Sequence, residues 1–159
     1  MTSAAVNQPM RDLSSLRVLL VDDNRHMLTL MHRVLAAMRI KTVHEKTDAK
    51  EAFAELKLIA PDLIFVDWVM EPLDGHEFVR MVRTSPESPC PNVPIVMVTG
   101  HTEEFRIKAA VAAGVNGFLA KPISPQMVYQ RICNVLDDPR QLNQRQGKTE
   151  SEPNQAAQA

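Results

Sequence analysis

Short apolar runs alternate along the chain with longer segments in which apolar residues recur every three or four positions. Unbroken apolar runs are typical of strands buried on both faces, and three-and-four spacing is typical of helices with one apolar stripe. The pattern predicts strands at residues 17–21, 41–45, 63–66, 95–98 and 117–120. It predicts helices at residues 27–38, 48–59, 75–82, 103–113 and 124–136.

Residues with strong local preferences mark the ends of these helices. Asp48 can cap the second helix, Gly114 can end the fourth, and Pro125 suits the first position of the last. The proline-rich stretch 85–94 separates the third helix from the fourth strand. Because strands and helices alternate, the expected fold is α/β, a three-layer (βα)5 domain with helices on both faces of one parallel five-stranded sheet.

Four of the predicted strands are followed by a residue that can handle phosphate or a divalent cation. Asp22 and Asp23 follow the first strand, and Asp67 follows the third. Thr99 and Lys121 follow the fourth and the fifth. In an open parallel sheet the carboxyl ends of all strands lie along one edge, where such folds place their ligand crevice. We therefore expect three carboxylates, a hydroxyl and an ammonium group to converge.

Carboxylates in this arrangement are the hard oxygen ligands that attract Mg²⁺. A single acid could be a solvated loop residue or a helix cap, but that explanation is weak for three acids at strand ends. Asp67 should stand at the sheet edge as a nucleophile that forms an acyl phosphate. The Lys121 ammonium and the Thr99 hydroxyl would then hold phosphoryl oxygens.

Five short motifs carry a resemblance to a known family. They are Val-Asp-Asp-Asn, Val-Asp-Trp-Val-Met, Leu-Asp-Gly, Val-Thr-Gly and Ala-Lys-Pro, in this order along the chain. With them, the chain resembles the receiver domain of two-component response regulators, of the stand-alone CheY-like type. The resemblance covers residues 15–138 and implies a flavodoxin-like strand order of 2-1-3-4-5. Residues 1–14 are then expected to form a flexible segment, and residues 139–159 a disordered tail.

The resemblance also implies a role for each candidate site residue. Asp67 would accept a phosphoryl group from a phosphohistidine. Asp23, Asp67 and the backbone carbonyl of Val69 would contact Mg²⁺ directly, and Asp22 would act mostly through water. Lys121 and Thr99 would hold the phosphoryl group.

Switching and partners follow from the same resemblance. Phe118 would turn inward when Thr99 moves toward the phosphoryl group, unless it is a static core aromatic. The alanine-rich fourth helix is where we expect the surface to shift, so a downstream protein would bind the face of helix four, strand five and helix five. The donor would be a histidine kinase or a histidine phosphotransferase that docks beside helix one. The expected function is therefore a phosphoacceptor in phosphorelay signal transduction, and not an enzyme acting on other substrates.

Composition excludes several other classes of function. A net charge of −1 over 159 residues lacks the basic surplus of a nucleic-acid binder. No apolar stretch approaches the roughly 20 residues that span a bilayer, so we expect no membrane insertion. Cys90 and Cys133 show no ligand-like spacing and read as reduced thiols, which favours a cytoplasmic location.

Some positions depart from the commonest family pattern. Glu71 stands where a proline is usual, and Pro72 comes one place later. Val69 replaces a residue that is often polar and offers no hydrogen bond to an attacking water, so we expect a long-lived phosphoryl group. His101 either donates a hydrogen bond at the edge of the site or, as we favour, is a solvated residue at the helix start.

Two other classes of function remain open at this stage. A phosphohydrolase of the haloacid-dehalogenase style also uses an aspartyl nucleophile with Mg²⁺, but it needs a second aspartate where Val69 stands. A flavodoxin-like redox carrier would need a glycine- and hydroxyl-rich phosphate cradle after the first strand. There the acids Asp22 and Asp23 would repel a flavin phosphate.

Overall fold

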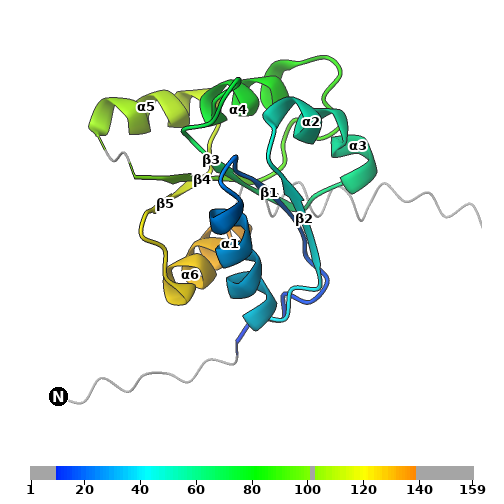
Figure 1. The fold of residues 1–159 in the computed structure, drawn as a ribbon, viewed down its shortest axis with the longest axis vertical. Helices are drawn as coiled ribbons and strands as arrows, with labels where there is room; N and C mark the ends of the chain where they lie inside the picture. The colour runs from blue at the N-terminus through cyan, green and yellow to red at the C-terminus, as the bar shows by residue number, and fades with distance from the viewer. Residues whose placement is uncertain (1–9, 101–102, 139–159) are drawn as a thin grey trace, which may run out of the picture.

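Five parallel strands form one sheet in the computed structural model, which describes residues 10–100 and 103–138. Their order across the sheet is β2-β1-β3-β4-β5, which confirms the expected fold and topology (Figure 1). The strands are β1 (Arg17–Val21), β2 (Thr42–Lys46), β3 (Leu63–Asp67), β4 (Ile95–Thr99) and β5 (Gly117–Ala120). The helices are α1 (Arg25–Ala37), α2 (Ala49–Ala54), α3 (Leu56–Ile59), α4 (Gly75–Thr84), α5 (Glu104–Ala113) and α6 (Pro125–Leu136).

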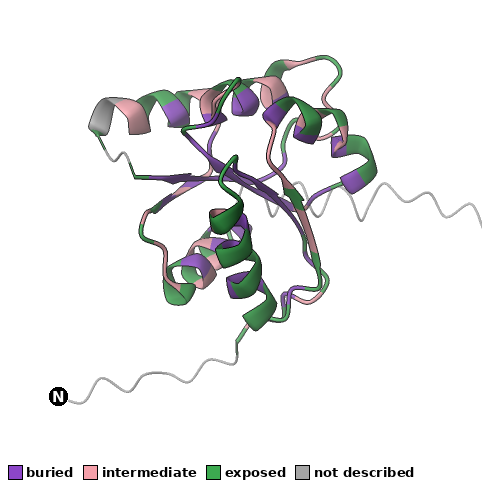
Figure 2. Cartoon of the chain, in the orientation of Figure 1, coloured by how far each residue is buried: buried purple, intermediate pink, exposed green. Residues whose placement is uncertain are grey.

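Helices cover both faces of the sheet, with α1 and α6 on one face and α2 to α5 on the other (Figure 1). Side chains of each strand point alternately to the two faces, so the sheet supplies two cores. Leu20 and Phe65 belong to the core under α1 and α6, whereas Leu19 and Ile64 belong to the core under α2 to α5. The strands β1, β3 and β4 are therefore buried almost throughout (Figure 2).

Most predicted elements differ from those observed by at most two residues at an end, and two differ in register or continuity. The second strand was expected at residues 41–45 and runs instead from Thr42 to Lys46, so that Lys46 pairs with Val21. The second helix was expected to be continuous, but it breaks at Glu55 into α2 and α3. The Glu55 carboxylate pairs with Lys46 beside the break, and both apolar residues of α3 that face the sheet are buried. The break therefore coincides with tertiary contacts of both segments, and the described chain has six helices instead of five.

Side-chain caps hold the starts of most helices in place. Asp48 accepts a hydrogen bond from the Glu51 N–H at 3.0 Å, as the sequence predicts, and Ser124 caps α6 ahead of Pro125. Asn24 and Asp74 cap α1 and α4 in the same way. These caps satisfy N–H groups that have no partner within their helix, and they fix where each helix leaves the sheet edge.

The chain before β1 packs against the end of α6. Leu13 is buried in the core under α1 and α6, and the Arg11 N–H donates to the Tyr129 hydroxyl at 2.9 Å. The Arg11 guanidinium pairs with Asp137. The packed structure thus includes part of the segment before residue 15, while the domain boundaries stay a prediction. None of the described helices is both long and apolar enough to cross a membrane.

Arg83 ties α4 to the opposite end of the sheet from the candidate site. Its guanidinium donates two hydrogen bonds to the Gly114 carbonyl oxygen, at 2.9 and 3.1 Å. It also donates to the Pro91 carbonyl oxygen at 2.9 Å and to the Asn116 side-chain oxygen at 2.8 Å. The Asn116 oxygen also accepts the Ile95 N–H at 2.9 Å. Burial lowers the pKa of Arg83 to about 10, so the group remains charged at neutral pH.

The substitution Arg83→Met should lower the free energy of unfolding by about 1–3 kcal/mol, because it leaves the half-buried Gly114 carbonyl and Asn116 side-chain oxygen without this donor. Chemical denaturation followed by circular dichroism measures the change. The matched control is Arg80→Met on the exposed face of the same helix, which should stay within about 0.5 kcal/mol of the wild type. Equal stability of the two variants would contradict this role for Arg83.

Candidate functional site

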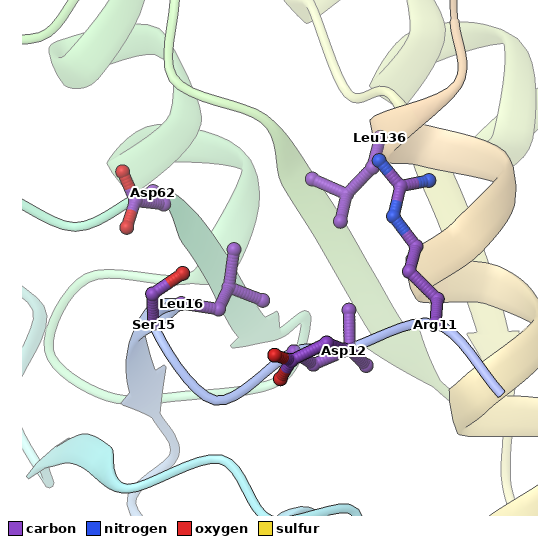
Figure 3. A pocket seen from close by; sticks show the side chains of 7 residues that line it. Arg11, Asp12, Ser15, Leu16, Asp62 and Leu136 are labelled. Atoms are coloured by element: carbon purple, nitrogen blue, oxygen red, sulfur yellow. The ribbon is translucent and has the colours of Figure 1, made fainter.

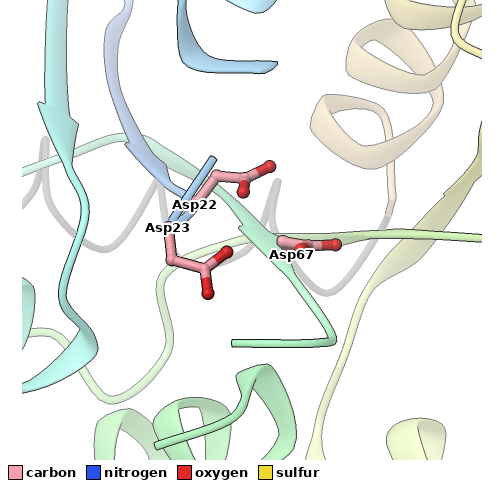
Figure 4. Close-up of side chains that lie close together, drawn as sticks. All are labelled: Asp22, Asp23 and Asp67. Atoms are coloured by element: carbon pink, nitrogen blue, oxygen red, sulfur yellow. The ribbon is translucent and has the colours of Figure 1, made fainter. Parts of the chain in front are cut away.

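Three aspartates meet at the carboxyl ends of β1 and β3. These strands pair in parallel, with Val21 opposite Val66, so the residues that follow each of them leave the sheet side by side. Asp22 and Asp23 come from the end of β1 and Asp67 from the end of β3 (Figure 4). One carboxylate oxygen from each lies within 4.8 Å of the others.

The next two strands add Thr99 and Lys121 to the same edge. Thr99 is the last residue of β4 and pairs with Ala120 at the end of β5. The Lys121 N–H donates to the Thr99 carbonyl oxygen at 2.9 Å, so the backbones of these two residues are directly joined. The Lys121 Nζ lies 3.1 Å from the Asp67 Oδ1. The structure therefore brings the three aspartates and Lys121 together, and it places the Thr99 backbone at the same sheet edge.

Burial dominates the electrostatics of this cluster. Asp22 and Asp67 are each 7% exposed, whereas Asp23 is exposed. Burial raises the pKa of Asp22 to about 6, the nearby Asp67 and Asp23 carboxylates add to the effect, and the Asn24 N–H, 2.8 Å from Oδ1, opposes it. Burial also raises the pKa of Asp67, against the lowering effect of its ion pair with Lys121.

This donor set fits a divalent cation. Three carboxylates approach one another where two of them are buried, and Lys121 is the cation that pairs with one of them in the described structure. Hard cations such as Mg²⁺ prefer carboxylate and carbonyl oxygens, and a second positive charge would offset the repulsion among the acids. Asp22, Asp23 and Asp67 are the side chains that would hold it.

Two further candidates, Val69 and Phe118, make no described contact with the carboxylates. Val69 is two residues beyond Asp67 in the loop between β3 and α4, and its side chain is 55% exposed. Phe118 is half-buried on β5 and packs against the core under α2 to α5. His101 lies outside the described residues.

Gly75 has a role that the sequence analysis did not identify. A Cβ atom at this position would collide with the Asp67 carbonyl oxygen and would lie 3.0 Å from the Trp68 Cα. The Gly75 N–H donates to the Trp68 carbonyl oxygen at 2.8 Å. The start of α4 therefore touches the backbone of the central aspartate, and the Asp-Gly pair before this helix was the available signal.

A cleft of about 370 Å³ lies at the other edge of the sheet (Figure 3). Its lining comes from the chain before β1, the residue before β3 and the end of α6, and it comprises Arg11, Asp12, Leu13, Ser15, Leu16, Asp62 and Leu136. Its charged side chains are of mixed sign, and Asp62 accepts the Arg17 N–H at 2.9 Å. The cleft shares no residue with the aspartate cluster.

In the absence of divalent cations, Asp22→Asn should stabilise the protein above pH 6. The folded-state pKa of about 6 exceeds the ordinary 3.8, so the folded protein binds more protons than the unfolded chain between these values and loses stability as pH rises through them. The expected gain is about 2–3 kcal/mol at pH near 7.5 and vanishes below about pH 3.

Chemical denaturation in the presence of a chelator, repeated across this pH range, measures the gain from Asp22→Asn. Glu87→Gln, at an exposed loop position, provides the control and should show no such pH-dependent gain. If Asp22→Asn stabilised the protein equally at both ends of the pH range, the gain would not arise from the raised pKa of Asp22.

Comparisons with a family profile and with curated proteins point to the same family. The sequence profile of the response regulator receiver domain matches residues 18–133. Chemotaxis protein CheY1 of Helicobacter pylori is 29% identical over 122 residues, which cover 76% of this chain and 97% of that protein. The CheY homolog of Campylobacter jejuni is 30% identical over 122 residues, which cover 76% and 92%.

A solved structure extends the likeness to three dimensions. The chemotaxis protein CheY4 of Vibrio cholerae superposes with a TM-score of 0.70 at 30% identity, over 76% of this chain and 98% of that one. The profile, the relatives and the strand order agree with one another. The chain therefore belongs to the response regulator receiver domain family and is a CheY-like receiver domain.

Proposed function

We propose that this protein is a phosphoacceptor in two-component signal transduction and that Asp67 is the residue modified. The observation that carries the proposal is the contact between Asp67 and Lys121 at 3.1 Å, beside two further carboxylates. Such a site offers a nucleophilic oxygen, a fixed cation and ligands for a second cation within one small volume. The family membership of the chain supports the same conclusion.

The reaction transfers a phosphoryl group from nitrogen to oxygen. A carboxylate oxygen of Asp67 attacks the phosphorus of a phosphohistidine, the P–N bond breaks, and its electron pair returns to the imidazole. The product is a mixed anhydride on Asp67. Mg²⁺, held by Asp22, Asp23, Asp67 and the Val69 carbonyl, would supply charge neutralisation for the phosphoryl oxygens.

Lys121 and Thr99 would hold the transferred group. In the described structure the Lys121 ammonium already pairs with an Asp67 oxygen, so phosphorylation would exchange this contact for one with a phosphoryl oxygen. The Thr99 hydroxyl would supply a further hydrogen bond. These two residues stabilise the product without taking part in bond making.

The switch follows from the charge that is added. A phosphoryl group brings a charge of about −1.5 to −2, which would draw Thr99 toward the site and leave room behind it for Phe118. The surface of α5, β5 and α6 would then change, and a downstream protein would bind there. The phosphoryl donor would be a histidine kinase or a histidine phosphotransferase docked beside α1, in the cytoplasm.

Two features favour this function over a phosphohydrolase of the haloacid-dehalogenase style. The position two residues after the nucleophile holds Val69, an apolar side chain that can neither donate nor accept the proton of an attacking or leaving group. The two relatives described above, which match the chain over 97% and 92% of their own length, are chemotaxis proteins.

Incubation with acetyl phosphate and Mg²⁺ should add one phosphoryl group to the wild type and none to Asp67→Asn, because the amide is a poor nucleophile. Intact-protein mass spectrometry gives the result directly. Asp62→Asn, at the far edge of the sheet, is the control and should be modified like the wild type. Equal modification of Asp67→Asn and the wild type would refute Asp67 as the acceptor.

The phosphoryl group should persist longer in the wild type than in Val69→Asn. An amide at this exposed position can orient the attacking water through one hydrogen bond of about 0.5–1.5 kcal/mol, which corresponds to decay about two- to tenfold faster. Loss of the added mass over time measures the decay. The control is Val111→Asn, at a similarly exposed valine on α5, which should leave the decay rate unchanged. A decay rate in Val69→Asn equal to or slower than that of the wild type would contradict the prediction.

A further inference from the structure

Trp68 extends the candidate site toward the helices on one face of the sheet. It directly follows Asp67, and its backbone is held from two sides, since its N–H donates to the Val98 carbonyl at 3.2 Å and its carbonyl accepts the Gly75 N–H at 2.8 Å. The residue is 9% exposed and belongs to the core under α2 to α5. Its ring is therefore a fixed platform attached to the residue beside the proposed acceptor.

Two helices contact this ring through their first turns. The His76 ring of α4 stacks on it, with 6.4 Å between centroids and 20° between planes. The Arg106 guanidinium of α5 lies over it, with the Cζ atom 5.8 Å from the ring centroid. A guanidinium within about 6 Å of an aromatic centroid is attracted by the electrons of the ring face. The start of α5 is thus linked electrostatically to the loop after Asp67.

Few other described apolar side chains pack α5 against the sheet. Ala110 is fully buried, Ile107 and Ala113 are half-buried, and the described residues of this helix are otherwise small or exposed. Arg106 stands at the end of α5 that follows Thr99, the residue expected to move toward a phosphoryl group.

We propose that the contact between Arg106 and Trp68 restrains the start of α5 in the unphosphorylated protein and so weakens the binding of a phosphoryl group at Asp67. The proposal rests on the proposed function. A ligand shifts an equilibrium between two states only by the difference in its affinity for them, and a contact made in the resting state alone opposes departure from that state. Arg106 is in this sense a positioning residue, because it acts through α5 and does not touch the reacting atoms.

The opposite effect would follow if Arg106 acted mainly as a nearby positive charge. A guanidinium that attracts the phosphoryl group directly would strengthen binding, and its removal would weaken it. General damage to the fold would also weaken binding. Tighter binding after loss of the guanidinium is therefore the result that separates the restraint from both alternatives.

The test measures binding of beryllium fluoride, a phosphoryl mimic, by calorimetry at saturating Mg²⁺. Arg106→Gln should bind it about two- to fivefold more tightly than the wild type, which is the fold-change expected for loss of one partly exposed cation–π contact. Arg106→Lys keeps a cation over the ring and should bind like the wild type. Arg80→Gln removes the same charge from the exposed face of α4 and should also leave the affinity unchanged.

A double-mutant cycle assigns the effect to the ring. In a Trp68→Leu background, Arg106→Gln should leave affinity unchanged, because the contact is already absent. Unchanged or weaker binding in Arg106→Gln, with a wild type that binds normally, would overturn this inference and leave the proposed function intact. A wild type that fails to bind the mimic would overturn the proposed function and this inference with it.

Discussion

The parallel pairing of β1 with β3 is the constraint on which the site depends. It places the ends of two buried strands side by side, so the acids that follow them come within 4.8 Å of one another although their charges repel. The apolar burial of both strands supplies the free energy that holds these charges in place. A flexible surface loop could carry the same residues, but repulsion among the carboxylates would move them apart.

The elements around the cluster position the three aspartates and Lys121 through their backbone groups. Asn24 caps α1 and donates its own N–H to Asp22, so the start of this helix is fixed to one carboxylate. The missing side chain of Gly75 lets α4 begin against the Asp67 backbone. The Lys121 N–H joins β5 to Thr99 on β4, which brings the ammonium within reach of Asp67. The four strand ends are therefore held next to one another largely through backbone N–H and carbonyl groups.

The central strands and the site residues could be predicted from sequence because one physical signal governs both. Val66 and Val98 lie in unbroken apolar runs, and the residue after each run stands at the ligand edge of a parallel sheet.

The edge strand β2 was misplaced by one residue because its polar side chains show no such run. The break at Glu55 lies beside an ion pair with Lys46 on another element, which no local preference reveals. The contacts of Arg83 with Gly114 and of Arg106 with Trp68 join segments distant in sequence, so pattern analysis along the chain does not find them.

The chain contains one tryptophan, and it is the residue next to Asp67. Indole fluorescence from this protein therefore arises at a single buried position between the acid cluster and two helices. Any change in emission on titration with a cation or a phosphoryl donor reports on that position, without the averaging that several tryptophans impose. Trp68 is thus an intrinsic fluorescent probe beside Asp67 and in contact with the first turns of α4 and α5.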